Sequence, residues 1–300
     1  MFRFMVTTLV AASAAACSID LQGEETIARE ERRFTITDPG RQGPLDVVIR
    51  TFDGAIDVRS WDREEVLVQI ERRAANAAEA KVLNVNTTQA PGRLTIEAPD
   101  PRRDRGDGVV HFGSWRSPNV SFIVTVPRRS TVQANSGDGA IAVRDVAGAV
   151  AVRTADGAVR VEHVGGSVQI DTGDGAVSAI DVDGALELNT GDGAVEVTGR
   201  LDALRLTTGD GPVRLDARQG SAMKSEWTVN TGDGAITVRV PSEFDANLET
   251  YTGDGRIIVS GVGNAESDHN DRATQLNVRL GNGGPALRVR TGDGTITVTR

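Results

Sequence analysis

Beyond residue 130, short runs of alternating apolar and polar residues repeat along the chain at a nearly fixed interval. The marker of each repeat is an Asp-Gly pair, which recurs every 18 residues at Asp138, Asp156, Asp174, Asp192 and Asp210. Later pairs follow after 23, 21 and 39 residues, at Asp233, Asp254 and Asp293. Six of these pairs belong to the full motif Thr-Gly-Asp-Gly. Such a period is typical of proteins in which each unit stacks on the previous one.

Each 18-residue unit contains two short stretches in which every second residue is apolar. One stretch follows the Asp-Gly pair, as at Val159 and Val161, and the other precedes the next pair, as at Val168 and Ile170. A period of two predicts a strand with one buried and one solvent-exposed face. A further apolar residue, such as Val164, falls between the two stretches. We therefore expect two strands in each unit, and no helix beyond residue 130.

The Asp-Gly pairs are expected to form the bends between strands. Gly adopts positive φ without steric cost, and an Asp side chain accepts hydrogen bonds from nearby backbone N–H groups. A structural, turn-forming role is therefore assigned to Asp138, Gly139, Asp174, Gly175, Asp192, Gly193, Asp233, Gly234, Asp293 and Gly294.

Two all-β architectures accommodate these units. In a single β-solenoid, of the β-helix or β-roll type, each unit is one two-strand coil and equivalent residues stack along the axis. In an antiparallel β-meander each unit is a hairpin. The constant period and the apolar residue at the bend favour the β-solenoid for residues 131–300, and the meander is the alternative.

The N-terminal third follows a less regular pattern. Residues 18–33 are rich in charge and are expected to form a tether, and residues 34–130 an irregular, mostly β cap. The Ala-rich stretch 74–81 predicts a short helix. A cap is expected because a bare terminal strand would promote aggregation. Strands are predicted near residues 45–50, 55–59, 65–72, 82–88, 93–98 and 120–126.

The first residues have the pattern of an export signal. Arg3 precedes a short apolar run that ends in small residues directly before Cys17, the single cysteine of the chain. The run is too short for a membrane-spanning helix and is typical of a signal peptide. Its end resembles a lipoprotein signal, which predicts residues 1–17 as the signal region, lipidation of Cys17 and anchorage in a lipid membrane. Ser18 favours the outer membrane by the same resemblance, and an ordinary secretory signal cleaved near Ala16 is the alternative.

Composition narrows the possible partners. The formal net charge is -9, with acidic and basic residues interspersed, which disfavours nucleic acid as a partner. Aromatic residues make up only 4% of the chain, so the core is expected to consist of Val, Ile, Leu and Ala in thin β layers.

Several short motifs occur together with the repeat. They are Asp57-Val58-Arg59-Ser60-Trp61-Asp62, Val124-Thr125-Val126-Pro127, and the closing Gly283-Gly284-Pro285 followed by Arg290-Thr291-Gly292-Asp293-Gly294. In combination they resemble the bacterial putative-adhesin family of unknown function, over roughly residues 30–300. The resemblance implies a β-solenoid in the cell envelope, outside the cytoplasm. It implies no catalytic residues.

The repetition also bears on catalysis and on metal binding. A catalytic site needs one unique constellation, whereas Asp occurs in every coil here, so we expect a non-catalytic binding module or scaffold without a cofactor. One alternative is a calcium-stabilised β-roll, because that fold also has 18 residues per coil and stacked Asp side chains would repel one another. Its candidate Ca²⁺ ligands are Asp156, Asp174, Asp192 and Asp210. A glycan-active β-helix enzyme is the second alternative.

Specific recognition is expected where the repeat is interrupted, at residues 112–116, 217–230 and 261–274. The candidate residues for contact with an envelope protein or a glycan are Trp115, Arg116, Trp227 and His269.

Overall fold

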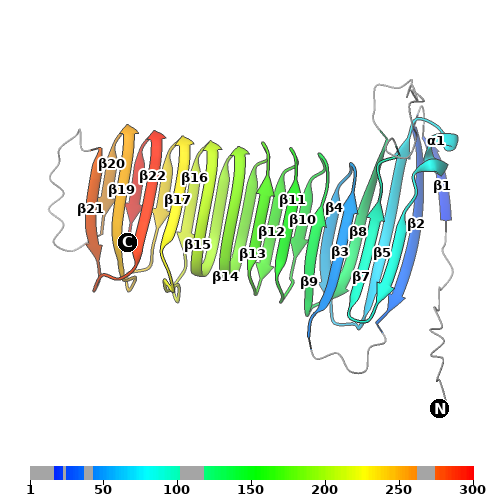
Figure 1. Ribbon diagram of the computed structural model, residues 1–300, viewed down its shortest axis with the longest axis horizontal. Coiled ribbons are helices and arrows are strands. Elements are labelled where there is room, and N and C mark those ends of the chain that lie inside the picture. Colours follow the sequence, from blue (N-terminus) through cyan, green and yellow to red (C-terminus); the bar gives the residue numbers. More distant parts are fainter. Residues whose placement is uncertain (1–16, 23–24, 37–42, 102–117, 262–273) are drawn as a thin grey trace, which may run out of the picture.

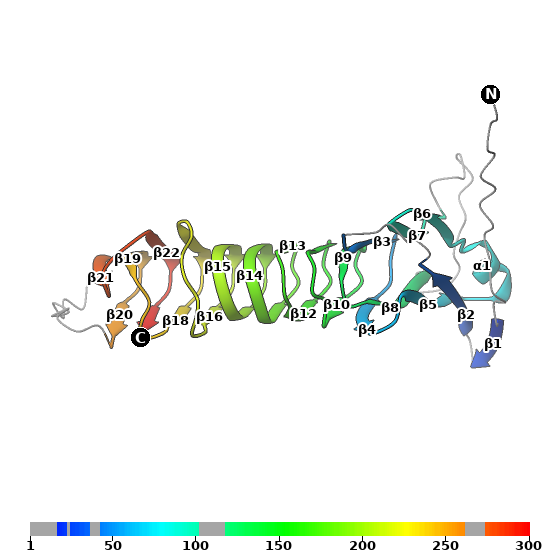
Figure 2. The ribbon, with the colours of Figure 1, turned by 90° about the horizontal axis from the view of Figure 1, so that it is seen from below.

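The structure, a computed structural model, describes residues 17–22, 25–36, 43–101, 118–261 and 274–300. Its strands stack side by side into an elongated body with the N-terminal and C-terminal regions at opposite ends (Figure 1). Seen from below, the body consists of two strand layers (Figure 2). The stacking strands pair in parallel from coil to coil, as at β10–β12 and β11–β13. The predicted β-solenoid is therefore confirmed, and the antiparallel meander is wrong.

One layer contains the strands that run into the Asp-Gly turns, and we call it the pre-turn layer. In spatial order its strands are β3 (Leu45–Thr51), β9 (Ser130–Asn135), β11 (Val150–Thr154), β13 (Val168–Thr172), the second halves of β14 (Val177–Asp192) and β15 (Val195–Asp210), β17 (Trp227–Asp233), β22 (Ala286–Asp293) and β19 (Ala246–Asp254).

The post-turn layer contains the strands that follow the turns. Its strands are β4 (Ile56–Trp61), β10 (Ile141–Arg144), β12 (Val159–Val164), the first halves of β14 and β15, β16 (Val213–Ala217), β18 (Ile236–Arg239), β23 (Ile296–Thr299) and β20 (Ile257–Ser260).

The core between the layers is built by in-register stacking of the alternating apolar residues. Val159, Val177, Val195 and Val213 occupy one row on four neighbouring strands, and each is 2% exposed. Val164 is buried at the bend that closes the side of the coil. Each fully buried Val or Leu contributes about 1.5–3 kcal/mol relative to an exposed position. A slip of one residue would turn the whole row towards solvent, so this burial also fixes the register.

The N-terminal region joins the solenoid earlier than the sequence pattern indicated. β3 pairs in parallel with β9, and β4 pairs in parallel with β10, so the first coil begins at Leu45 rather than at residue 131. The remaining elements form the cap. They are β1 (Cys17–Gln22), β2 (Glu25–Thr35), β5 (Glu65–Ala74), α1 (Ala77–Val82), β6 (Asn86–Ala90), β7 (Arg93–Ala98) and β8 (Asn119–Pro127).

The predicted tether at residues 18–33 is wrong. β2 pairs with β5 in an antiparallel ladder from Thr26–Ala74 to Thr35–Glu65, and β1 pairs with β2. The charges of this segment are used in ion pairs between strands, since Arg72 contacts Glu30 at 2.8 Å. High charge therefore indicated a polar strand surface here and not a free linker.

At the C-terminal end, spatial order departs from chain order. β22 lies between β17 and β19, and β23 lies between β18 and β20. The last coil of the chain is thus inserted between two earlier coils, and β21 (Gln275–Leu280) lies antiparallel to β19 beyond them. Within the described residues, no helix has the length and apolar character needed to cross a bilayer.

Candidate ligand-binding surface

The Thr of each repeat motif points inwards and donates a hydrogen bond to the neighbouring coil. Thr154 Oγ1 lies 2.9 Å from the Gly137 carbonyl oxygen and 3.0 Å from that of Gly139, to which it donates. Thr190 repeats this contact with the carbonyl of Gly173 at 3.1 Å. The Gly137 and Gly173 carbonyls also accept a backbone N–H from the neighbouring coil, so each Thr hydroxyl adds a second donor at the same contact. The Thr row is therefore part of the framework.

The Asp and Gly residues of the motif are also explained by stacking. Asp192 Oδ1 accepts the Asp210 backbone N–H at 3.2 Å, and Asp210 Oδ1 accepts the Asp233 N–H at the same distance. A Cβ at Gly175 would collide with the Gly157 carbonyl. Gly234 instead adopts a φ of 144°, which disfavours other residues. The pairs lie at the predicted turns, but close approach of the coils matters there as much as positive φ.

The Asp column gives no geometric support to the calcium alternative. Its carboxylates are exposed, and Asp192 and Asp210 already bind backbone N–H groups. In the part of the chain that the structure describes, no three Asp, Glu, His or Cys side chains are gathered closely enough to hold a metal ion.

The residues predicted to contact partners are not brought together. Trp227 is 0% exposed and packs against Phe244, with ring centroids 5.2 Å apart, so it fills the core and presents no surface. The partner-binding assignment of Trp227 is therefore wrong. Trp115, Arg116 and His269 lie outside the described residues, as do residues 1–16 of the predicted signal.

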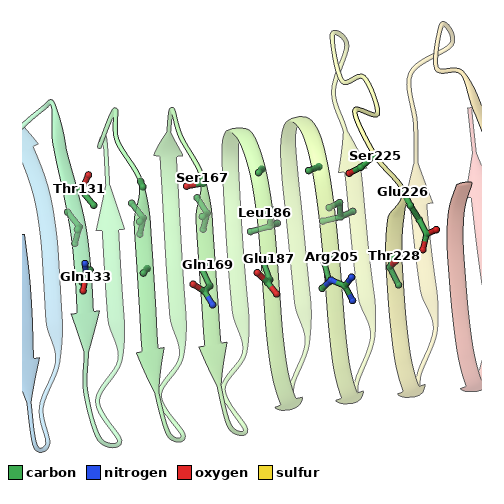
Figure 3. Close-up of a pocket in the computed structure, with 18 residues that line it drawn as sticks. Thr131, Gln133, Ser167, Gln169, Leu186, Glu187, Arg205, Ser225, Glu226 and Thr228 are labelled. Carbon is green, nitrogen blue, oxygen red and sulfur yellow. The ribbon is translucent and has the colours of Figure 1, made fainter. Parts of the chain in front are cut away.

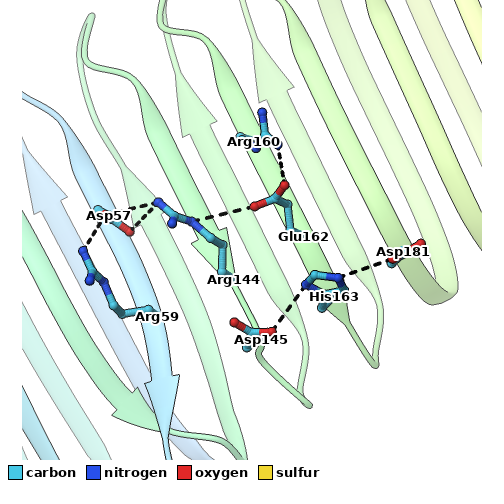
Figure 4. Close-up of polar contacts among 8 residues, drawn as sticks. All are labelled: Asp57, Arg59, Arg144, Asp145, Arg160, Glu162, His163 and Asp181. Carbon is cyan, nitrogen blue, oxygen red and sulfur yellow. Dashed lines mark hydrogen bonds and ion pairs between the residues drawn. The ribbon is translucent and has the colours of Figure 1, made fainter.

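A chain of ion pairs lies on the outer surface of the post-turn layer (Figure 4). Arg144 contacts Asp57 at 3.2 Å and Glu162 at 3.9 Å, and Glu162 also accepts a hydrogen bond from Arg160 at 2.5 Å. That hydrogen bond, more than the other contacts, holds the pKa of Glu162 below its usual range. Exposed pairs of this kind contribute little stability each.

A second charged group lies at the adjacent bend. The His163 ring lies between Asp145 and Asp181, with 3.4 Å from a ring nitrogen to each carboxylate (Figure 4). The backbone φ is 61° at Asp145, 52° at His163 and 57° at Asp181, so the same left-handed turn is stacked in three coils. Asp tolerates this conformation better than His.

Each layer carries a shallow trough along its outer surface. The post-turn trough has a volume of about 770 Å³ and an Ala floor. The pre-turn trough, of about 740 Å³, runs from Thr131 on β9 to Thr228 on β17 (Figure 3). Its floor contains Ala149, Ala185 and Ala203. Its polar side chains are Thr131, Gln133, Ser167, Gln169, Glu187, Arg205, Ser225, Glu226 and Thr228.

Beside the pre-turn trough, a row of polar side chains crosses the whole layer. Each member is the residue immediately before the Thr or Ser of a repeat motif, and we call this set the pre-Thr row. In spatial order it consists of Asn135, Arg153, Asp171, Asn189, Thr207, Asn230, Arg290 and Tyr251. Because these positions alternate with buried ones, all of them lie on the outer surface of the layer.

The repeat architecture and its matching motifs can be compared with known families. The model of the Toastrack DUF4097 domain matches residues 46–299, which is most of the chain. The chain belongs to the Toastrack DUF4097 family. This match confirms the family resemblance that the sequence motifs indicated. It also treats the first coil, at β3 and β4, as part of the same unit as the regular repeats.

Two solved structures are similar to the Toastrack chain. One is a putative cell adhesion protein from Clostridium sporogenes ATCC 15579, with 9% identity, a TM-score of 0.29, and coverage of 90% of this chain and 99% of that one. The other is a putative adhesin from Bacteroides fragilis NCTC 9343, with 12% identity, a TM-score of 0.38, and coverage of 90% and 96%. At these values neither likeness bears on function. A comparison with curated proteins found no match.

Sequence reasoning missed the pre-Thr row of this Toastrack solenoid. The signal was present, because aligning the repeats on their Thr residues places the preceding residues in one column. The interruptions of the repeat are the more conspicuous departures from the pattern, whereas this column varies inside otherwise regular units. The neighbours of Arg290 were also hidden, since the insertion of β22 between β17 and β19 has no marker in the sequence.

Proposed function

We propose that this chain is an exported envelope protein, anchored by a lipid on Cys17, that acts without catalysis as an adhesin-like binding module or scaffold. The observation that carries the proposal is the geometry of the solenoid. It holds two long outer surfaces open along many coils, each with a shallow trough, on a framework in which every coil is fastened to the next. Such extended surfaces are the usual binding sites of solenoid proteins.

A non-catalytic role fits the distribution of the charged residues. The Asp side chains of the turns repeat from coil to coil and serve backbone hydrogen bonds. The charged chain around Glu162 consists of exposed ion pairs. Neither arrangement forms the single cluster of paired carboxylates that glycan hydrolysis requires.

Anchorage is tested by metabolic labelling with an alkyne fatty acid in the producing bacterium. The wild-type chain should incorporate the label and sediment with the membranes. Cys17→Ser should lose the label and appear in the soluble envelope or the medium. An unlabelled wild-type chain that fractionates with soluble proteins would contradict the lipid anchor.

Adhesion is tested by comparing cells that lack the gene with cells complemented by the wild-type chain. Attachment to surfaces or to other cells should fall in the deletion strain and return on complementation. Equal attachment together with unchanged resistance to detergents and antibiotics would contradict both the binding and the scaffold role.

A further inference from the structure

The pre-Thr row divides into two halves with different use of their polar groups. In the first half, Asp171 accepts hydrogen bonds from Arg153 at 3.1 Å and from Asn189 at 3.0 Å. In the second half, the side chains of Thr207, Asn230, Arg290 and Tyr251 make no hydrogen bond or ion pair with any described residue. We call these four residues the Tyr251 platform. Thr207, Arg290 and Tyr251 are exposed, so their hydrogen-bonding groups are free for a ligand, whereas the Asn230 Oδ1 atom is buried.

The platform is assembled by the exchanged order of the last coils. Arg290 on β22 lies opposite Asn230 on β17 on one side and opposite Tyr251 on β19 on the other. Thr207 on β15 lies opposite Asn230. Four neighbouring strands thus present their side chains at intervals of about 4.8 Å.

Tyr251 is the only tyrosine of the chain, and about half of it is open to solvent. Its side chain is 48% exposed, whereas the other large exposed apolar residues of the described part of the chain lie elsewhere, Ile123 on the cap strand β8 and Ile258 on the post-turn layer. Exposed Tyr offers a rigid apolar ring and a hydroxyl, which suits it to recognition. The C–H face of a pyranose ring stacks on such an aromatic ring.

The surrounding groups suit a polyhydroxyl ligand. Thr and Asn side chains carry donors and acceptors for hydroxyl groups, and Arg donates to hydroxyl oxygens. The pre-turn trough adds Gln169, Arg205 and Thr228, and it leads to Asn230, which lies two residues beyond Thr228 on β17 (Figure 3). A chain of sugars laid along the solenoid axis would therefore meet hydrogen-bonding groups on each successive strand and a ring at the C-terminal end.

The charges favour a neutral chain over an acidic one. Arg288, next to the platform, is already paired with Glu226 at 2.5 Å and Glu249 at 2.9 Å. Glu187 lies opposite Arg205. Local charge is therefore nearly balanced, and the whole chain is acidic at -9, which disfavours polyanions. A peptide strand would add to a sheet edge, whereas the platform lies on the face of a layer.

From these observations we infer that the Tyr251 platform and the adjoining pre-turn trough bind a neutral polysaccharide. The inference rests on the proposed function, for which it names the surface and the chemical class of the partner.

The test is affinity electrophoresis of the full chain in native gels that contain dextran, laminarin, mannan, galactan or xylan. At least one of these neutral polysaccharides should retard the wild-type chain. Tyr251→Ala and Arg290→Ala should each weaken that binding by about tenfold, the scale of a central contact in an interface. Tyr251→Phe keeps the ring and should retain most of the affinity.

Matched controls lie on the opposite layer. Arg214→Ala and Ile258→Ala remove an exposed guanidinium and an exposed apolar side chain there, and both should bind like the wild type. Thermal melting of every variant should match the wild type, because all four positions are exposed. Equal losses in the Arg214 and Ile258 variants, or none in the Tyr251 and Arg290 variants, would overturn the placement of the site.

Other outcomes separate this inference from the proposed function. Retardation by none of the five polysaccharides, or only by alginate or heparin, would overturn the neutral-polysaccharide assignment. Binding to an envelope protein that depends on Tyr251 would overturn it as well. In these cases a loss of attachment in the deletion strain would leave the proposed adhesin-like role standing. Polysaccharide binding without any attachment or envelope phenotype would contradict the proposed adhesin-like role and leave the neutral-polysaccharide assignment standing.

Discussion

On the outer surface of the post-turn layer, the residue after the Asp-Gly pair is Ala in five of the eight repeats, at positions 140, 158, 176, 194 and 235, and it is Pro212, Arg256 or Thr295 in the others. On the pre-turn layer, the residue before each Thr changes from coil to coil among amide, guanidinium, carboxylate, hydroxyl and phenol groups. The inward residues of the two layers are nevertheless alike, with Val159 and Val168 equally buried at 2%. Packing thus constrains both layers in the same way, and only the outward positions distinguish them.

This difference indicates where a repeat protein carries recognition. A position that serves the stacking must be the same in every coil, because each coil meets the same neighbour. A position that is free of stacking contacts is able to vary without cost to the fold. The pre-Thr row varies in chemistry, whereas the residue that follows it is Thr in every regular coil except the first, where Ser136 donates a similar hydrogen bond to Gly54.

The largest expected effect on stability comes from truncating a side chain in the core between the two layers. Trp227→Ala would leave a cavity under the pre-turn layer and lose the contact with Phe244. We expect a loss of about 3–5 kcal/mol in the free energy of unfolding. Chemical denaturation followed by circular dichroism measures it. Tyr251→Ala, an aromatic residue removed from the surface, should leave the denaturation midpoint unchanged. Equal effects of the two changes would contradict the assignment of Trp227 to the core.

A smaller effect on stability is expected to distinguish the buried Thr row from the exposed pre-Thr row at the adjacent residues Thr208 and Thr207. Thr208 is 2% exposed and donates to the Gly191 carbonyl at 3.2 Å, whereas Thr207 is exposed. Thr208→Val preserves the shape but removes the donor, so a loss of about 1 kcal/mol is expected. Thr207→Val should have little effect on the melting temperature. The reverse order would show that the outer row, and not the inner one, fastens the coils.

The sequence alone was sufficient for the architecture of the regular coils. A period of two inside a period of 18 leaves few alternatives, because each strand must bury one face and each turn must recur in the same place. The Phe52-Asp53-Gly54-Ala55-Ile56 segment carries the same Asp-Gly-Ala-Ile pattern as Asp138-Gly139-Ala140-Ile141, and Ile56 stacks on Ile141.

Other features depended on contacts between distant segments. The charged residues of β2 resemble a linker until Arg72, some forty positions later, is placed beside Glu30. The position of β22 between β17 and β19 depends on contacts between whole coils, and no local sequence pattern encodes it. The predicted site at Trp227 failed because an aromatic residue in an interruption of a repeat also serves to fill a wider coil.

The smallest expected effect concerns the ion pairs of the post-turn layer. Hydrogen bonding from Arg160 holds the pKa of Glu162 below its usual range, so the folded state binds this proton less readily than the unfolded state. The pair therefore stabilises the fold at neutral pH, and this contribution fades as the pH falls below about 4.3, the ordinary value for Glu. Because the Arg160 side chain is 60% exposed, solvent screens the pair and its contribution to stability is small.

The Glu162→Gln variant isolates the contribution of this ion pair to stability. Its melting temperature should lie slightly below that of the wild type at pH 7, and the two should converge in acid or in high salt, where the charge is neutralised or screened. Glu187→Gln is the matched change on the pre-turn layer, where the carboxylate has no ion-pair partner within the described residues. Its melting temperature should match that of the wild type at pH 7. If the melting temperature of Glu162→Gln stayed below that of the wild type in acid, the Glu162 side chain would stabilise the layer by packing. The charge of Glu162 would then not contribute to the contact between coils.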